Sequence, residues 1–298
     1  MTNNKLLKSS VGIIILSVVI IMIANIMLKV DKPVFLENYC EYPLSYYKDP
    51  SYNGSYCEQL FTLKYITNVN DKKTVTEIQF DGLGENNYAY ASEYEPFGNW
   101  MYYDAGELNE TIYGIYSVRE VTVQLMLYFE KEPLDNIVIN SATVYFSDGS
   151  QQQVNLGEII FYYEKGLDEA INFKGSFSSS NGDFTADGEA LRDITISRIY
   201  SPLFKYCHQY IDLYLSGISY LEVSDELYKA NENIIIKGKF YPPENVKVRY
   251  TIYQLAPKIY YINEKGEKWY IRGQSISYEP YEFKFLDIIK YLKVLEEI

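Results

Sequence analysis

His208, the single histidine of this 298-residue chain, directly follows Cys207, so a thiol nucleophile and a base are neighbours there. Adjacent residues in an extended segment point to opposite faces, and the two side chains therefore cannot readily hydrogen-bond to each other. A catalytic histidine also needs an orienting group, and nothing in the sequence indicates one. We predict no catalytic residue here and expect Cys207 to be a small buried hydrophobe. Catalysis that needs two histidines is excluded.

The segment from Asp183 to Gly188 carries half of a calcium-binding loop. Asp183, Thr185 and Asp187 occupy positions 1, 3 and 5 of the loop, with Gly188 at position 6. Position 12, which needs a bidentate acid, is Ile194. A polar, flexible loop explains the same residues without metal, and the chain lacks the paired cysteines of a zinc site. We therefore expect no metal and no cofactor. A weaker calcium site is the alternative, with oxygens from Asn181, Asp183, Asp187 and Glu189.

Cys40 and Cys57 bracket a stretch rich in Tyr, Pro and Gly that has little core of its own. A disulfide between them would close a loop of roughly 17 residues and add about 3 kcal/mol of stability in the chain-entropy model. Such a bridge fits an oxidising compartment outside the cytoplasm. Two unrelated thiols are the alternative.

Aromatic residues gather between Asn86 and Tyr103 in a segment that contains Gly and Pro and resembles a loop. Exposed tyrosine and tryptophan beside Asn and Glu could form a platform for a sugar or a protein partner. The competing explanation is composition, because 33 tyrosines are spread over the whole chain and Tyr is a good strand residue. The candidate binding residues are Tyr88, Tyr90, Tyr94, Trp100 and Tyr103.

The clearest signal in the sequence is an uncharged, apolar run from Val11 to Leu28, flanked by Lys8 and Lys29. At ~1.5 Å per residue the run gives about 27 Å of helix, close to the roughly 30 Å hydrocarbon core of a bilayer. A cleaved signal peptide is the alternative, but the run is long and lacks a small-x-small cleavage site. We expect an uncleaved anchor in the cell membrane, with a short cytoplasmic N-terminus and residues 33–298 outside.

Charge divides with this topology. Residues 1–32 hold four lysines and one aspartate, a net +3, whereas the whole chain carries −13, so the remainder carries −16. An acidic surface repels phosphate, which excludes nucleic acid as a partner.

Beyond residue 32, short runs of β-branched and aromatic residues broken by turn signals predict a mainly β region of antiparallel sandwich-like units. Asp148-Gly149 predicts a hairpin between 137–146 and 153–163, and a second hairpin is expected between 60–67 and 74–80. The expected units are 33–174 and 191–298, and the Gly/Ser-rich stretch 175–190 is expected to be a linker or a long loop between them.

The apolar residues at the C-terminal end of the chain recur at the spacing of a helix. Phe285, Ile288, Ile289, Leu292 and Leu295 share one face, which predicts an amphipathic helix within 283–298. We expect this helix to cap a sheet. A docking helix for a partner is the alternative.

Together these features predict a single-pass, membrane-anchored, extracytoplasmic and non-catalytic module that contacts an envelope component or a protein partner. Two alternatives remain. One is an envelope hydrolase with a carboxylate pair, since nothing in the sequence singles out a pair among the 40 acids. The other is an accessory subunit of a membrane complex, held through Ser17 and Asn25 on one face of the anchor helix.

Overall fold

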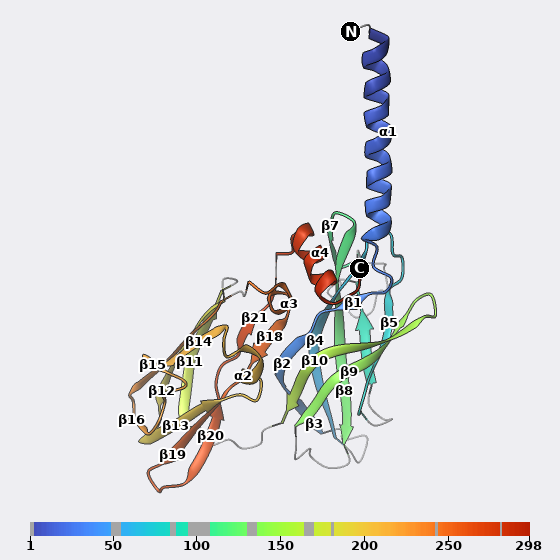
Figure 1. Cartoon of the computed structure of the whole chain (residues 1–298). Helices are drawn as coiled ribbons and strands as arrows, with labels where there is room; N and C mark the ends of the chain where they lie inside the picture. The colour runs from blue at the N-terminus through green and yellow to red at the C-terminus, as the bar shows by residue number, and fades with distance from the viewer. Residues whose placement is uncertain are drawn as a thin grey trace.

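Strands make up most of the chain, as the alternation of apolar and polar residues predicts. The computed structural model describes residues 3–48, 55–83, 88–94, 108–129, 136–163, 170–179, 182–241, 244–280 and 282–298. In this part of the chain the strands form four sheets that pack in pairs as two β-sandwiches, and a long N-terminal helix projects from one of them (Figure 1). The predicted mainly β, antiparallel fold is confirmed.

The first sandwich encloses a core of aliphatic and aromatic side chains from two sheets. Its first sheet comprises β1 (Val34–Phe35), β3 (Ser45–Lys48), β4 (Ser55–Asn68), β6 (Tyr88–Ser92), β7 (Glu110–Tyr113) and β8 (Tyr116–Phe129). Its second sheet comprises β2 (Asn38–Pro43), β5 (Val75–Phe80), β9 (Ile137–Phe146), β10 (Gln151–Tyr162), β18 (Ile252–Leu255) and β21 (Ile276–Tyr278).

The second sandwich encloses a second core, which also takes in Ile160, Tyr253, Leu255 and Ile276 from the second sheet of the first sandwich. One sheet has the order β11 (Ile171–Ser178), β12 (Asp183–Ala190), β17 (Asn233–Phe240), β14 (Ile211–Leu215) and β15 (Ile218–Ser219). The facing sheet has the order β16 (Glu226–Tyr228), β13 (Ile194–Tyr200), β19 (Lys258–Asn263) and β20 (Lys268–Arg272). The short helices α2 (Phe204–Cys207) and α3 (Val246–Arg249) connect strands.

Sequence order and sandwich membership differ at the C-terminal end. β18 and β21 come late in the chain, yet β18 pairs in parallel with β2 of the first sandwich. From β18 the chain passes through Ala256 and Pro257 directly into β19 of the second sandwich. The two sandwiches therefore share a continuous strand segment.

A buried ion pair lies where the sandwiches meet. Glu41 on β2 accepts hydrogen bonds from the guanidinium of Arg272 on β20 at 2.8 Å, from the Ser201 hydroxyl at 2.7 Å and from the Ala256 amide at 3.0 Å. The Glu41 side chain is fully buried and that of Arg272 is 9% exposed. The Arg272 guanidinium also lies 4.0 Å from the centroid of the Tyr162 ring. Because both charges are paired and hydrogen-bonded, this contact between the sandwiches leaves neither charge without a partner despite its burial. We call it the Glu41–Arg272 joint.

The N-terminal helix α1 (Asn3–Met27) ends against the first sandwich. The Tyr116 hydroxyl donates to the Leu28 carbonyl at 2.7 Å, and the Asn68 side chain bonds both the amide and the carbonyl of Val30. The C-terminal helix α4 (Phe285–Val294) packs beside this exit with Ile288, Tyr291 and Leu292 buried; its neighbours are Val30, Leu36, Ile66, Tyr116 and Tyr250. The predicted amphipathic helix is confirmed as one that covers the first sandwich.

Within α1 the structure describes side chains at positions 10–19, 22–23 and 26–27. Over the residues so described, no helix combines the length and apolarity needed to cross a membrane. The anchor therefore stays a prediction.

Two local expectations are wrong. The predicted linker 175–190 contains most of the antiparallel β11–β12 pair, because backbone pairing with β17 orders these small polar residues. The expected hairpin around 68–73 does not form, since β4 pairs with β8 while β5 pairs with β9 in the other sheet. By contrast, the Asp148-Gly149 hairpin is confirmed as β9–β10.

Candidate functional site

The aromatic platform predicted from sequence is described only in part. Tyr90 on β6 is 63% exposed and Tyr94 just after it is 43% exposed. Tyr88 lies on β6, but its side chain is outside the described residues, as are Trp100 and Tyr103 entirely. The platform therefore stays a prediction.

All three cysteines are free, buried thiols. Burial raises the pKa of the Cys40 thiol to about 12, of Cys57 to about 11 and of Cys207 to about 12. The Cys40–Cys57 disulfide predicted from spacing is absent from the structure. Cys40 lies on β2 and Cys57 on β4, in the two sheets of the first sandwich, and each fills its core. Between them, residues 45–48 of β3 pair with 55–58 of β4, and this pairing needs no covalent closure.

The half calcium loop lies on a strand. Asp183, Thr185 and Asp187 alternate along β12, so their side chains line one face at a two-residue spacing and do not converge. Asp183 pairs with Lys239 at 3.0 Å. Among the residues that the structure describes, no three His, Cys, Asp or Glu side chains form a cluster that could hold a metal ion.

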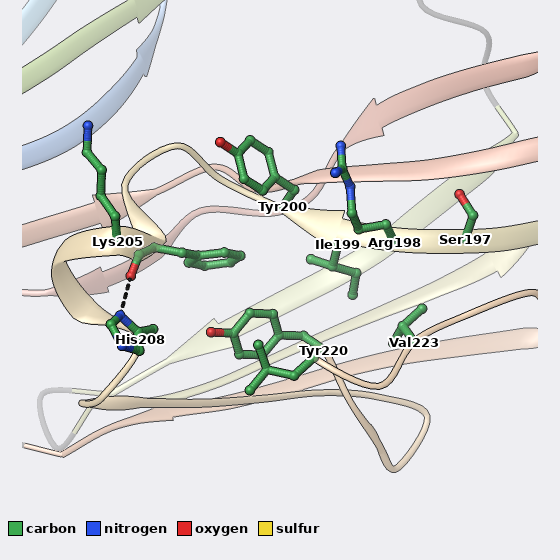
Figure 2. Close-up of a pocket in the computed structure, with 10 residues that line it drawn as sticks. Ser197, Arg198, Ile199, Tyr200, Lys205, His208, Tyr220 and Val223 are labelled. Atoms are coloured by element: carbon green, nitrogen blue, oxygen red, sulfur yellow. Dashed lines mark hydrogen bonds between the residues drawn. The ribbon is translucent and has the colours of Figure 1, made fainter.

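A groove that sequence reasoning missed lies on the second sandwich, at one edge of β13. We call it the β13 groove (Figure 2). It has a volume of about 460 Å³ and is open to solvent. One wall is formed by β13 from Ser197 to Tyr200, the opposite wall by the Tyr220–Val223 turn, and one end by α2 with Lys205 and His208.

The strand edge at this wall is unpaired. β19 pairs with β13 at 194–196 and 198–200, with a bulge at Ser197. On the other side β16 pairs only with 194–196. Within the described part of the chain, no strand covers 197–200 on that side. Its backbone groups therefore face the groove without a sheet partner, as at any free strand edge.

The floor of the groove is apolar. Ile199, Phe204 and Val223 are buried there, and the Phe204 and Tyr220 rings lie 4.8 Å apart. Leu221 stands at the rim with 77% of its surface exposed, and Tyr200 at the opposite rim is also exposed. Large apolar side chains on both rims are typical of surfaces that are covered by a partner.

Two polar groups in the groove have hydrogen-bonding capacity that no described residue uses. The Tyr220 side chain is 7% exposed, and among the described residues its buried hydroxyl has no hydrogen-bond partner. His208 Nδ1 lies 3.2 Å from the Phe204 carbonyl oxygen. Since a carbonyl only accepts, Nδ1 is the donor, and Nε2 is the nitrogen left for a ligand. His208 thus bonds the backbone of its own helix, whereas Cys207 is buried.

One cation, Arg198, lies on the β13 side, and Lys205 lies at the end formed by α2. The Arg198 guanidinium lies 4.9 Å from the Tyr200 ring centroid and 4.6 Å from that of Tyr260, which holds it on the outer face of β13 (Figure 2). Lys205 pairs with Glu158 of the first sandwich at 2.9 Å. On the opposite rim, Glu222 is exposed beside Leu221. Arg198 on the β13 side and Glu222 on the opposite rim therefore carry opposite charges.

An acid with a raised pKa lies elsewhere, in the first sandwich. Burial raises the pKa of Glu93, although the Val75 amide, the Tyr65 hydroxyl and Arg119 oppose the shift. Glu93 Oε2 lies 3.8 Å from Arg119, whose Nε also bonds Glu110 at 3.1 Å. Glu93 and Arg119 are both nearly fully buried. The group is an interior ion cluster and does not line the β13 groove.

No family model matches the chain, and no curated protein matches it. Solved structures give weak similarities. The D00-D0 domain of Intimin is 10% identical over 83% of this chain and 99% of that one, with a TM-score of 0.22. A Porphyromonas gingivalis W83 protein of unknown function is 9% identical over 83% and 99%, with a TM-score of 0.23. The fibronectin(III)-like modules of Clostridium thermocellum CbhA are 11% identical over 86% and 96%, with a TM-score of 0.17. Scores this low assign no family to the chain.

Proposed function

We propose that this protein is a membrane-anchored, extracytoplasmic and non-catalytic interaction module that holds the β13 groove at a fixed position relative to the bilayer. The observation that carries the proposal is a set of contacts that fix the end of α1 to the first sandwich and the first sandwich to the second. Its links are Tyr116 to Leu28, Asn68 to Val30, Glu41 to Arg272, and the stacking of Tyr39 on Tyr206 at 4.0 Å.

Two observations support the proposed membrane anchor: the uncharged sequence of the run and the exposure of its apolar side chains. Residues 11–28 carry no charge. Every apolar side chain of α1 that the structure describes is exposed, from Val18 at 44% to Ile26 at 76%. A helix with apolar side chains exposed along its length requires apolar surroundings, and a bilayer supplies them.

The chemistry of the groove favours binding over catalysis. Its histidine is committed at Nδ1 to a backbone carbonyl, and the neighbouring thiol is buried with a raised pKa. The one buried carboxylate with a raised pKa among the described residues, Glu93, is enclosed with Arg119 away from the groove. A free strand edge with apolar rims is instead suited to holding a partner.

Cysteine labelling tests the topology. In intact cells a membrane-impermeant maleimide should label Leu221→Cys, because this rim position is exposed and would face outward. The labelled protein should sediment with membranes. The unaltered chain is its own blank, since its three buried thiols should stay unlabelled.

Asn4→Cys, placed before the apolar run, is the matched control and should be labelled only after lysis. Labelling of Leu221→Cys only after lysis, or its recovery in the soluble fraction, would contradict the proposed function.

A further inference from the structure

We propose that the β13 groove binds an extended peptide segment, which adds to the free edge of β13, inserts an apolar side chain opposite Ile199 and places an acidic side chain opposite Arg198. This inference rests on the proposed function and names the class of partner. Strand addition uses the backbone for affinity and alternate side chains for specificity.

The backbone part follows from the pairing. Residues 198–200 pair with β19 on one side and, in the described part of the chain, with no strand on the other. An incoming strand would satisfy edge groups that are otherwise left to water. The groove runs beside this edge, so the space for such a strand already exists.

The side-chain part follows from alternation. Ile199 points into the groove, whereas Arg198 and Tyr200 point to the outer face (Figure 2). Side chains directly opposite each other on paired strands share a face. The residue opposite Ile199 would therefore enter the apolar floor beside Phe204 and Val223. Its two neighbours would lie next to Arg198 and Tyr200.

The positive charges on the outer face of β13 favour an acidic residue in the bound peptide. Arg198 is held on the outer face by two tyrosine rings, and Lys258, opposite Tyr200 on β19, adds a second cation to the same face. Opposite charges on directly paired residues stabilise a sheet. Glu222 lies on the far rim, so an acidic side chain is favoured only beside β13.

The Tyr220 hydroxyl supplies an independent indication of a ligand. It is buried in the groove and has no partner among the described residues. Polar groups in such a position are normally satisfied. A peptide carbonyl or amide in the groove would complete it, which an apolar ligand could not do.

The test uses the full-length protein in detergent and a fluorescent nine-residue peptide in which valine and aspartate alternate. Fluorescence anisotropy should show saturable binding. A peptide with lysine in place of aspartate should bind at least about 10-fold more weakly, as should the Asp–Val peptide to Leu221→Asp or Arg198→Glu. Leu60→Asp is the matched control: Leu60 is 54% exposed on β4 of the first sandwich, and its replacement should leave binding unchanged.

Backbone methylation distinguishes strand addition from simple filling of the groove. Successive amides of a strand point to opposite edges. Methylating either all valine or all aspartate nitrogens should therefore abolish binding for one peptide and spare it for the other. Equal effects of the two methylations, no saturable binding, or equal binding to Leu221→Asp and Leu60→Asp would overturn the inference. If Leu221→Cys is still labelled from outside, the proposed function survives that result.

Discussion

Glu41→Ala should lower the free energy of unfolding by about 3–5 kcal/mol, because it leaves the Arg272 guanidinium buried without its carboxylate. Arg272 is 9% exposed, and Glu41 also accepts from Ser201 and Ala256, so three donors lose their carboxylate acceptor at once. Urea unfolding of the full-length protein in detergent, followed by fluorescence, measures the change. The contact between the two sandwiches is expected to weaken as well, so that the second sandwich unfolds at a lower urea concentration than the first.

Two variants control for this effect. Ser201→Ala removes one donor and should cost about 1 kcal/mol. Glu77→Ala, at an exposed position on β5, should change stability by less than ~0.5 kcal/mol. If Glu41→Ala lowered the free energy of unfolding by no more than Ser201→Ala does, the buried ion pair would not couple the sandwiches.

Arg119→Leu should cost a similar ~3–5 kcal/mol, because it leaves Glu93 as an unpaired charge in the first sandwich. Arg119 also donates to the Lys73 and Asp71 carbonyls at 2.6 and 2.5 Å, and both bonds would be lost. Urea unfolding at pH 7 measures this deficit. Adding Glu93→Gln should recover part of it, since the uncompensated charge is then gone.

The pH dependence of the Arg119→Leu deficit has a definite sign. The pKa of Glu93 is already raised in the folded protein, and loss of Arg119 removes an opposing influence and raises it further. A group whose folded pKa is raised binds its proton more tightly when folded, so protonation stabilises the fold. The deficit should therefore shrink as the pH falls from 7 toward the ordinary glutamate value of 4.5. A deficit that grows over this range would contradict the assignment.

Features encoded by neighbouring residues could be predicted from the sequence. The Asp148-Gly149 turn and the apolar face of α4 need only local spacing, and both are found. Strand partners could not be predicted in this way. β4 pairs with β8 through contacts such as Tyr65 with Arg119, which lie 54 residues apart. The Gly/Ser-rich stretch 175–190 was misassigned for the same reason, since distant β17 orders it.

The β13 groove carries no local sequence signature. It exists because β16, with three residues, is shorter than the β13 strand it pairs with, and because the Tyr220–Val223 turn of another element faces the uncovered edge. Ser197 and Leu221 are unremarkable in sequence. An exposed leucine becomes informative only when its surroundings are known. Conversely, Cys40 and Cys57 suggested chemistry by their spacing, but they fill the core as free thiols.

The central claim, that the β13 groove is where this protein meets its partner outside the cell, is tested most directly by photo-crosslinking in living cells. A photoreactive amino acid at position 221 should give a discrete crosslinked adduct in the membrane fraction. Arg198→Glu should abolish that adduct, and the same amino acid at position 60 should give none. No adduct at position 221, or the same adducts at both positions, would contradict the claim.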